Sequence, residues 1–179
     1  MQHDTPGSAP LIVTATLPAD LQAWADRLRT QHFPPERNFL RAHVTLFHAL
    51  PGMVLDEVRD VMAQMCRTTP PVRARLAGIM DLGGGTAFRI ESDGILALRR
   101  ELAERFHGLL TGQDSHAPRL HVTIQNKVVR AQAMALQNAL RPDFAEAEFT
   151  FAGLALHHYL NGPWQGAGAW SFRGAARRR

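Results

Sequence analysis

Two short stretches of the chain carry the same set of residues suited to acid–base chemistry. Residues 41–47 read RAHVTLF and residues 119–125 read RLHVTIQ, so Arg-x-His-Val-Thr followed by an aliphatic residue occurs twice, with His43 and His121 78 positions apart. Packing in a strand explains the repeated valine and aliphatic residue, but it does not require the histidine and the threonine. The repetition therefore indicates two strands that contribute to one functional site.

Side chains alternate between the two faces of a strand, so residues two positions apart lie on the same face. This parity predicts a polar face in each motif: Arg41, His43, Thr45 and Phe47 in the first copy, and Arg119, His121, Thr123 and Gln125 in the second. The intervening aliphatic residues form the opposite, buried face. His48 has the opposite parity to His43, so it is expected to leave the polar face if the strand continues.

The chemistry that fits paired histidines and threonines is hydrolysis or transesterification of a phosphodiester. Histidine titrates near neutrality, so a neutral imidazole can take a proton from water or a ribose hydroxyl while a protonated one gives a proton to the leaving oxygen. Threonine hydroxyls two residues further on can donate hydrogen bonds to the non-bridging oxygens, where charge builds up. This scheme requires no metal ion.

The rest of the sequence predicts a mixed α/β chain around these motifs. Apolar periodicity and turn signals give the order β-α-β-α-β-β-α-β-α-β-β. Strands are expected at 11–17, 43–47, 72–82, 86–92, 120–128, 148–160 (with an irregularity at Gly153) and 169–174, and helices at 18–33, 55–66, 92–110 and 130–142. Ser92 or Asp93 is the expected cap of the third helix.

Composition bounds the class of protein. A chain of 179 residues with 45% apolar content is expected to form a single domain, 1–179. No segment suggests a membrane span or a secretion signal, so a cytoplasmic location is expected. The lone cysteine, Cys66, excludes an internal disulfide and multi-thiolate zinc sites, and it is expected in the core. The basic residues are nineteen arginines and one lysine, an excess that either favours an anionic partner or reflects codon bias. The basic segment 174–179 is expected to be flexible.

The two motifs, HVTL and HVTI, resemble the paired H-x-T/S-x signature of the two-histidine (2H) phosphoesterase superfamily, which includes 2′-5′ RNA ligases and cyclic phosphodiesterases. The segment LALHHYLNGPW (154–164) is similar to the late strand and loop of that family. The resemblance implies an α+β fold of two pseudo-symmetric lobes. Each lobe would hold an antiparallel sheet lined by one motif, with helices outside and an active cleft between the lobes.

The same resemblance implies which residues act and on what. It assigns catalysis to His43, Thr45, His121 and Thr123, with no cofactor and no metal, and an activity that opens 2′,3′-cyclic phosphates of RNA ends or nucleotides. Two alternatives stay open: 2′-5′ RNA ligation at the same site, and an RNA- or nucleotide-binding module with negligible turnover. The expected partner is an RNA terminus or a small nucleotide with a cyclic or 2′-5′ phosphodiester. The protein is expected to be a monomer. Which of the two histidines is the base is left open.

Further side chains are candidates for substrate binding, each with a structural alternative. Arg41 and Arg119 either bind phosphate or face solvent at the strand starts. Phe47 either stacks on a base or packs in the core, and Gln125 orients a ligand or a histidine. The remaining candidates lie outside the motifs: Tyr159 and Trp164, with His157 beside them, in a base-binding wall or an aromatic cluster, and Phe88 and Arg89 at the rim of the cleft.

Overall fold

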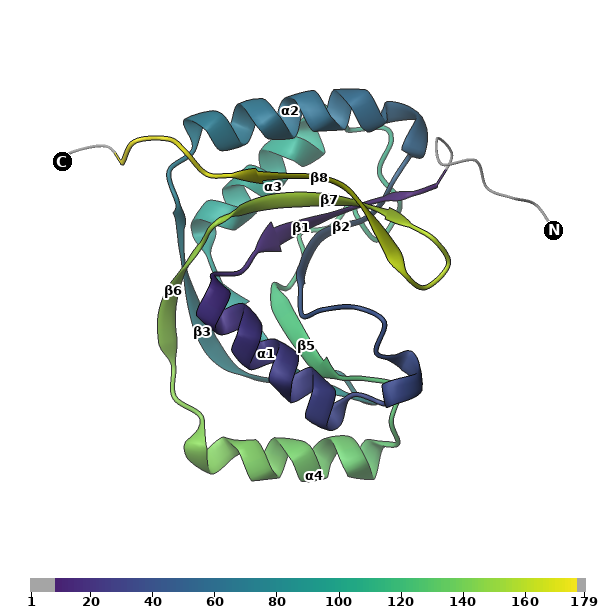
Figure 1. Cartoon of the computed structure of the whole chain (residues 1–179), viewed down its shortest axis with the longest axis vertical. Coiled ribbons are helices and arrows are strands. Elements are labelled where there is room, and N and C mark those ends of the chain that lie inside the picture. The colour runs from purple at the N-terminus through teal and green to yellow at the C-terminus, as the bar shows by residue number, and fades with distance from the viewer. Residues whose placement is uncertain (1–8, 177–179) are drawn as a thin grey trace.

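The computed structural model describes residues 9–176, which form two four-stranded antiparallel sheets that curl toward each other (Figure 1). The first sheet has the strand order β2-β1-β7-β8 and the second has the order β5-β4-β3-β6. The strands are β1 (Leu11–Thr16), β2 (Val44–Leu50), β3 (Val72–Asp81), β4 (Thr86–Glu91), β5 (His121–Gln125), β6 (Ala147–Phe151), β7 (Gly153–Tyr159) and β8 (Trp164–Ser171). The predicted two-lobed α+β fold is confirmed.

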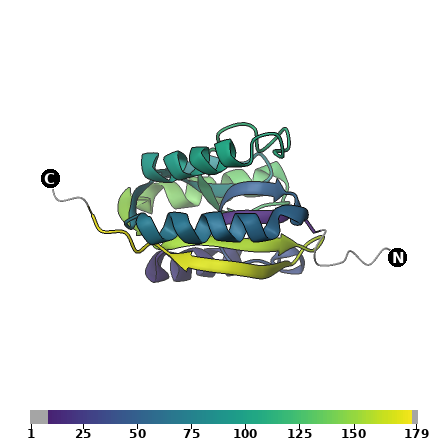
Figure 2. The same ribbon diagram turned by 90° about the horizontal axis from the view of Figure 1, so that it is seen from above.

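Within residues 9–176, four α-helices cover the outside of the sheets (Figure 2). They are α1 (Ala19–His32), α2 (Leu55–Thr68), α3 (Asp93–Arg105) and α4 (Arg130–Leu140). Helix α2 packs against β7 and β8, α4 packs against β3 and β4, and α1 crosses from the first sheet to contact β5 of the second. Helix α3 lies beside α2, where Arg105 forms an ion pair with Glu57 at 3.3 Å. None of the helices in residues 9–176 has the length and apolarity that crossing a membrane requires.

The aliphatic positions of the two motifs supply the centre of the core. Val44 and Leu46 in β2 and Val122 and Ile124 in β5 are all fully buried, as period-2 alternation predicts. Burial also raises the pKa of Cys66 to about 11, which suits a core thiol rather than a nucleophile. At the start of α3, Ser92 is the cap, because its hydroxyl accepts a hydrogen bond from the Ile95 amide at 3.3 Å.

The single strand predicted over 148–160 is in fact two strands in different sheets. It breaks at Ala152, with β6 pairing with β3 in the second sheet and β7 pairing with β1 in the first. Gly153 makes the crossing possible, since a Cβ there would lie 2.0 Å from the Trp170 carbonyl oxygen. The last strand also begins earlier than predicted, at Trp164, which brings that side chain onto the first sheet.

A β-bulge in the first motif changes which side chains share a face. Thr45 lies opposite Thr14, but Phe47 lies opposite Val13, so Leu46 is an extra residue without a partner in β1. One extra residue reverses the alternation that follows it. Phe47 therefore turns away from the face of Thr45 and is fully buried, so its parity prediction was wrong and the alternative of a core position is confirmed.

The second motif has a bulge at the equivalent position. Thr123 lies opposite Ala87 and Gln125 lies opposite Thr86, which leaves Ile124 as the extra residue. Gln125 is 2% exposed and its amide oxygen accepts a hydrogen bond from the Thr86 hydroxyl at 3.2 Å. The predicted ligand-facing position of Gln125 was also wrong, and the shared bulge makes the two motifs alike in backbone as well as in sequence.

Candidate active site

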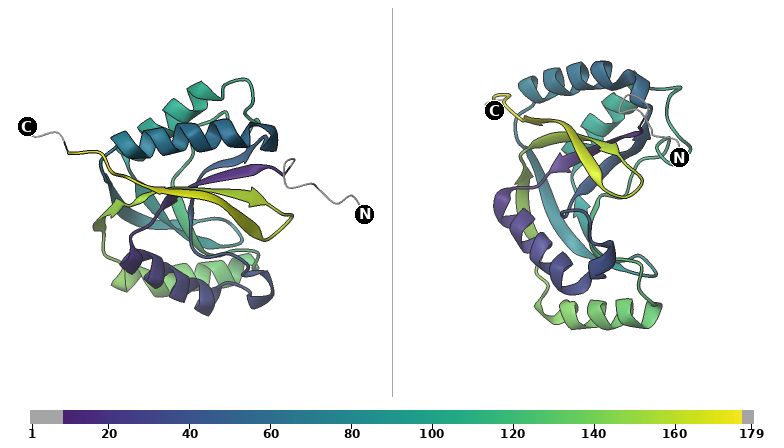
Figure 3. Two further views of the ribbon diagram at one scale, coloured as in Figure 1. Left: turned by 45° about the horizontal axis from the view of Figure 1, so that its top comes forward. Right: turned by 45° about the vertical axis from the view of Figure 1, so that its right-hand side comes forward.

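The two motif histidines and both motif threonines line one cavity of about 340 Å³, here called the central cavity. His43 immediately precedes β2 and His121 is the first residue of β5. These two strands contact each other where the sheets meet (Figure 3). Thr45 and Thr123 follow two positions later and face the same space, so the structure brings together all four residues of the paired motifs.

Both histidines are held in the same orientation by their own strand. The Nδ1 atom of His43 lies 2.8 Å from the Arg41 carbonyl oxygen, and that of His121 lies 2.7 Å from the Arg119 carbonyl oxygen. A carbonyl can only accept a hydrogen bond, so Nδ1 carries the proton in each ring. Each Nε2 is consequently free to take a proton when neutral or to donate one when charged.

His43 has a strongly altered proton affinity. Burial is the main cause that lowers its pKa to about 4, and the nearby charges of Arg29, His157 and His121 lower it further, against a smaller opposing effect of the hydrogen bond to the Arg41 carbonyl. His43 is therefore neutral near pH 7 in the free protein. A neutral imidazole with a free Nε2 is the form that acts as a base.

Two buried arginines link each half of the molecule to the motif of the other half. Arg29 of α1 donates to the Thr123 carbonyl at 2.9 Å, and Arg99 of α3 donates to the Leu46 carbonyl at 3.4 Å. Both arginines are 5% exposed or less. Each contact therefore holds one motif strand against a helix from the other half of the chain.

Sequence reasoning missed these two arginines, although the helical pattern contained a signal. Arg29 lies four positions after the buried Ala25, and Arg99 lies four positions after the buried Ile95. Positions four apart share a helix face, so each arginine stands on the apolar side of its helix. A charge at such a position needs partners inside the protein. Here the partners include the backbone carbonyls of Thr123 and Leu46 beside the central cavity.

His48 lies at the central cavity, contrary to the parity prediction. The bulge at Leu46 reverses the alternation before His48 and so returns it to this side. Its Nδ1 bonds the Asp114 carboxylate at 3.2 Å, and the same carboxylate accepts the backbone amides of His48 and Ala49 at 2.9 Å each. Asp114, in the loop between α3 and β5, thus binds the amides that the bulge leaves outside the ladder.

Asp114 is 1% exposed. Burial alone would raise the pKa of its carboxyl, but the hydrogen bonds from the His48 side chain and from the amides of His48 and Ala49 together lower it. The group is therefore an anion that the bulge stabilises. Sequence reasoning gave Asp114 no role, since nothing in the loop pattern connects it with a strand 65 or 66 residues earlier.

We expect Asp114→Ala to destabilise the fold by roughly 2–3 kcal/mol, because it leaves the two amides at the bulge without their acceptor. The measurement is urea unfolding followed by circular dichroism. Asp56→Ala is the matched control, since the Asp56 side chain is 95% exposed and its loss is expected to change the free energy of unfolding by about 0.5 kcal/mol or less. Equal stability of the two variants would contradict the role given to Asp114.

A second cavity of about 360 Å³, here called the Trp164 pocket, shares His43 with the central cavity. The Trp164 ring lies 4.5 Å from the His43 ring and 5.2 Å from the His157 ring, measured between centroids. Arg41 also lines this pocket, with its guanidinium 2.9 Å from the Asp26 carboxylate. Trp164 thus lines a pocket beside two histidine rings, and its part in binding a base stays a prediction.

The other candidates fall in different places. Arg119 lines the central cavity. Tyr159 is 40% exposed and lines neither of the two cavities. Phe88 is buried in the core against Trp24, which excludes the rim position, and Arg89 forms an ion pair with Glu91.

His157 and His158 point to opposite sides of β7 as predicted, since His157 lines the Trp164 pocket and His158 is buried.

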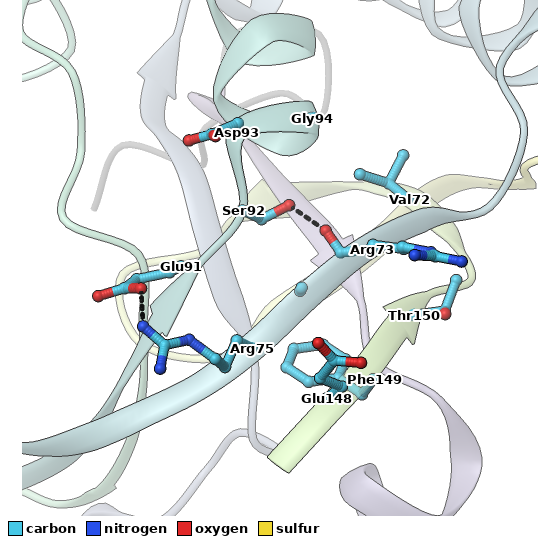
Figure 4. Close-up of a pocket in the computed structure, with 11 residues that line it drawn as sticks. Val72, Arg73, Arg75, Glu91, Ser92, Asp93, Gly94, Glu148, Phe149 and Thr150 are labelled. Carbon is cyan, nitrogen blue, oxygen red and sulfur yellow. Dashed lines mark hydrogen bonds and ion pairs between the residues drawn. The ribbon is translucent and has the colours of Figure 1, made fainter. Parts of the chain in front are cut away.

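A larger hollow of about 670 Å³ lies away from the motifs, between β3, β6 and the start of α3 (Figure 4). Arg75 in its wall forms ion pairs with Glu91, which also lines the hollow, and with Glu146 outside it. The Ser92 hydroxyl is likewise engaged, since it donates to the Arg73 carbonyl at 2.7 Å. Neither of the two motifs contributes to this hollow, so the candidate site is the central cavity.

The sequence profile of the 2′-5′ RNA ligase superfamily matches residues 17–163. This match covers both motifs and most of the chain, and the chain belongs to the 2′-5′ RNA ligase superfamily of phosphoesterases and ligases. No curated protein sequence matches the chain at a significant level.

Solved structures with the same fold include proteins of two bacteria. The chain is similar to TT0787 of Thermus thermophilus, with 20% identity, a TM-score of 0.62 and coverage of 93% of this chain and 100% of that one. It is also similar to Escherichia coli LigT, in a complex with 3′-AMP (16% identity, TM-score 0.63, coverage of 92% and 98%) and in a complex with NADP⁺ (17% identity, TM-score 0.59, coverage of 93% and 99%). At these identities the likeness establishes the fold.

Proposed function

We propose that this protein is a metal-independent phosphodiesterase that opens 2′,3′-cyclic phosphates of RNA ends or nucleotides. The observation that carries the proposal is the symmetry of the central cavity, where His43 and His121 each have Nδ1 bonded to a carbonyl and Nε2 free. A phosphate placed between two such nitrogens can receive a nucleophile on one side and lose a leaving group on the other. Membership of a phosphoesterase and ligase superfamily supports the same reaction class.

In the proposed reaction, Nε2 of His43 takes a proton from a water molecule as the water oxygen bonds to phosphorus. The bond from phosphorus to one ribose oxygen breaks, and Nε2 of His121 gives its proton to that oxygen. The products are a ribose hydroxyl and a phosphomonoester, and proton exchange with solvent restores both histidines. The assignment of base and acid follows the lowered pKa of His43, which keeps it neutral.

The surrounding side chains have supporting tasks in this scheme. The hydroxyls of Thr45 and Thr123 donate hydrogen bonds to the non-bridging oxygens as their charge grows. Arg29 and Arg99 hold the strands that carry these groups, through the carbonyls of Thr123 and Leu46. Because His121 protonates the leaving ribose oxygen, the nucleoside lies on the His121 side and the attacking water on the His43 side.

The similar solved structures support a nucleotide substrate. Escherichia coli LigT was crystallised with 3′-AMP, with ATP and with NADP⁺. A nucleoside 3′-phosphate is the kind of product that results when water opens a 2′,3′-cyclic phosphate at the bond to the 2′ oxygen. A cleft of the same fold in this chain, lined by the paired motifs, is accordingly assigned to nucleotides.

One observation favours 2′-5′ ligation as a second candidate activity. His43 lines both the central cavity and the Trp164 pocket, so an RNA hydroxyl approaching from the Trp164 pocket would reach the same base that activates water. The ribose hydroxyl would then replace water, the bond from phosphorus to the 3′ oxygen would break as that oxygen takes the acid's proton, and the product would be a 2′-5′ phosphodiester. Both activities use the same two proton transfers, so the competing nucleophile decides between them.

We expect the acid limb of the kcat/KM profile for a 2′,3′-cyclic nucleotide, where the rate falls because the base gains a proton, to lie near pH 4. The base must be neutral, and a pKa lowered to about 4 keeps His43 neutral well below the usual titration range of histidine. The measurement is a pH–rate profile, with circular dichroism at each pH to verify folding. An acid limb near pH 6.5 would contradict the assignment of His43 as the base.

Trp164→Ala provides the matched variant for this profile. Its indole covers His43 at 4.5 Å, and burial is the largest cause of the lowered pKa. Removing the indole admits water to the imidazole and is expected to move the acid limb upward, toward the ordinary value. An unchanged limb would mean that the Trp164 ring does not control the proton affinity of His43.

The test of the proposed function is a comparison of phosphate linkages with a chelator present. Purified protein is incubated in EDTA with a 2′,3′-cyclic nucleotide, a 2′-5′-linked dinucleotide and a 3′-5′-linked dinucleotide, and the products are separated by chromatography. We expect turnover of the cyclic phosphate to be fastest. A lack of turnover on all three, with retained binding of nucleotides, would favour the binding-module alternative.

A further inference from the structure

Apart from the exposed Gln113 and the buried Asp114, three polar side chains of the central cavity have no task in the two-histidine reaction. His48 comes from β2, while His116 and Arg119 come from the segment between α3 and β5. They line the same cavity as the paired motifs, and Arg119 stands two positions before His121. The cavity is therefore equipped to contact more of a ligand than the single phosphate undergoing reaction.

The two additional histidines are oriented like the motif histidines. Nδ1 of His48 bonds the Asp114 carboxylate at 3.2 Å, and Nδ1 of His116 bonds the Gly112 carbonyl at 2.9 Å. Both acceptors lack a proton to give, Asp114 because its carboxyl is ionised, so each ring carries its proton on Nδ1 and leaves Nε2 available. Arg119 gives only its backbone carbonyl to His121, and within residues 9–176 its guanidinium takes part in no ion pair.

The charge of this part of the cavity matches an anion. Asp114 is the acidic residue among the described side chains that line the cavity, and it is 1% exposed. Its two oxygens already accept hydrogen bonds from the amides of His48 and Ala49 and from the His48 ring. A ligand therefore meets guanidinium and imidazole groups rather than a free carboxylate, which suits the oxygens of a phosphate.

We propose that His48, His116 and Arg119 form a subsite for a second phosphate, the 5′-phosphate of the same nucleoside whose 2′,3′-cyclic phosphate reacts. This inference rests on the proposed function, which puts the nucleoside on the His121 side of the scissile phosphate. The ribose then carries its 5′ oxygen away from the reacting centre and toward the remaining cavity wall. The preferred substrate is a 5′-phosphorylated nucleotide or the terminal nucleotide of an RNA strand, rather than a nucleoside cyclic phosphate with a free 5′-hydroxyl.

The test measures binding, so its result does not depend on turnover. Isothermal titration calorimetry compares a nucleoside 3′-phosphate, the matching nucleoside 3′,5′-bisphosphate and a dinucleotide 3′-phosphate. We expect the bisphosphate to bind wild type about tenfold or more tightly than the monophosphate, as charge-assisted hydrogen bonds from an arginine and two histidines would give. Comparing the bisphosphate with the dinucleotide distinguishes a 5′-phosphomonoester from an internal phosphodiester, and an advantage for either supports a second-phosphate subsite.

Variants locate the second phosphate. Arg119→Ala, His116→Ala and His48→Phe, which keeps a ring and removes both nitrogens, are each expected to lose most of the preference for the bisphosphate. His48 is 44% exposed on its side chain, so the phenylalanine has room. Arg100→Ala is the control, because Arg100 is exposed on α3 and lies outside the cavity, and it is expected to keep the preference.

Two results would overturn the inference. One is equal affinity of wild type for the monophosphate, the bisphosphate and the dinucleotide. The other is a preference that survives in Arg119→Ala, His116→Ala and His48→Phe alike, because the second phosphate would then bind elsewhere. Failure of the proposed function would be recognised separately, by wild type that shows the preference in calorimetry but does not turn over any cyclic phosphate.

Discussion

His43→Ala and His121→Ala are each expected to lower kcat for a 2′,3′-cyclic nucleotide by about 10³-fold or more, as the loss of a positioned acid or base typically does. Without His43 nothing in the pair takes the proton of water, and without His121 the ribose oxygen leaves unprotonated. The measurement is kcat from product formation at saturating substrate. The two substitutions remove single side chains at the edge of a cavity, so folding is expected to be retained.

The double variant and a control sharpen this prediction. Because the two histidines act in one concerted transfer, His43→Ala combined with His121→Ala is expected to be scarcely slower than either single variant, as residues that act as a unit are not additive. His107→Ala removes an exposed histidine just beyond α3 and is expected to keep wild-type kcat. Independent, multiplying losses in the double variant would mean that the two histidines do not act in the same step.

Thr45→Val and Thr123→Val are each expected to lower kcat by about 10²-fold, the usual cost of removing one hydrogen-bond donor from developing negative charge. Valine has nearly the shape of threonine and suits a strand, so the change isolates the hydroxyl. Thr45→Ser and Thr123→Ser keep the donor and are expected to recover most of the rate. The measurement is kcat, with KM compared because the hydroxyls are assigned mainly to the transition state.

A matched control for the threonine variants lies in β6. Thr150 is an exposed strand residue away from the central cavity, and Thr150→Val is expected to leave kcat unchanged. If Thr45→Val and Thr123→Val raised KM without lowering kcat, the hydroxyls would bind substrate and transition state equally. That result would contradict their role in stabilising charge that appears during the reaction.

The sequence predicted the class of fold and the placement of the four motif residues because both depend on local patterns. Alternating aliphatic residues placed Val44 and Val122 in the core, and the repetition of the motif indicated that the two strands meet. Apolar residues at helical spacing predicted the helices in the same way, and the cap at Ser92 marked the start of α3. These features need only neighbours a few positions away, which a sequence displays directly.

The errors arose where the backbone departs from regular periodicity. A bulge at Leu46 and another at Ile124 reversed the expected directions of Phe47 and Gln125. The bulge at Leu46 also returned His48 to the cavity. A bulge depends on the partner strand as much as on its own residues. The partner of the first bulge is β1, which comes much earlier in the chain.

The second kind of omission concerned long-range contacts. Asp114 reaches β2 from a loop, and Arg29 reaches the Thr123 carbonyl across 94 positions of the chain. Such contacts join segments that are far apart in the chain, which no local pattern records. The strand switch at Ala152 is similar, since its physical cause is the close approach of Gly153 to the Trp170 carbonyl. These features add the supporting residues to a site whose centre the repeated motif had already indicated.

Metal-free attack of water on the cyclic phosphate can be observed directly by phosphorus NMR of wild-type protein acting on a 2′,3′-cyclic nucleotide in ¹⁸O-water with EDTA present. We predict that the cyclic diester signal is replaced by a phosphomonoester signal carrying the shift of one ¹⁸O atom. Water would then have attacked phosphorus without a metal ion, as the two histidines allow. A cyclic phosphate that stays intact until a divalent metal ion is added would contradict the two-histidine mechanism.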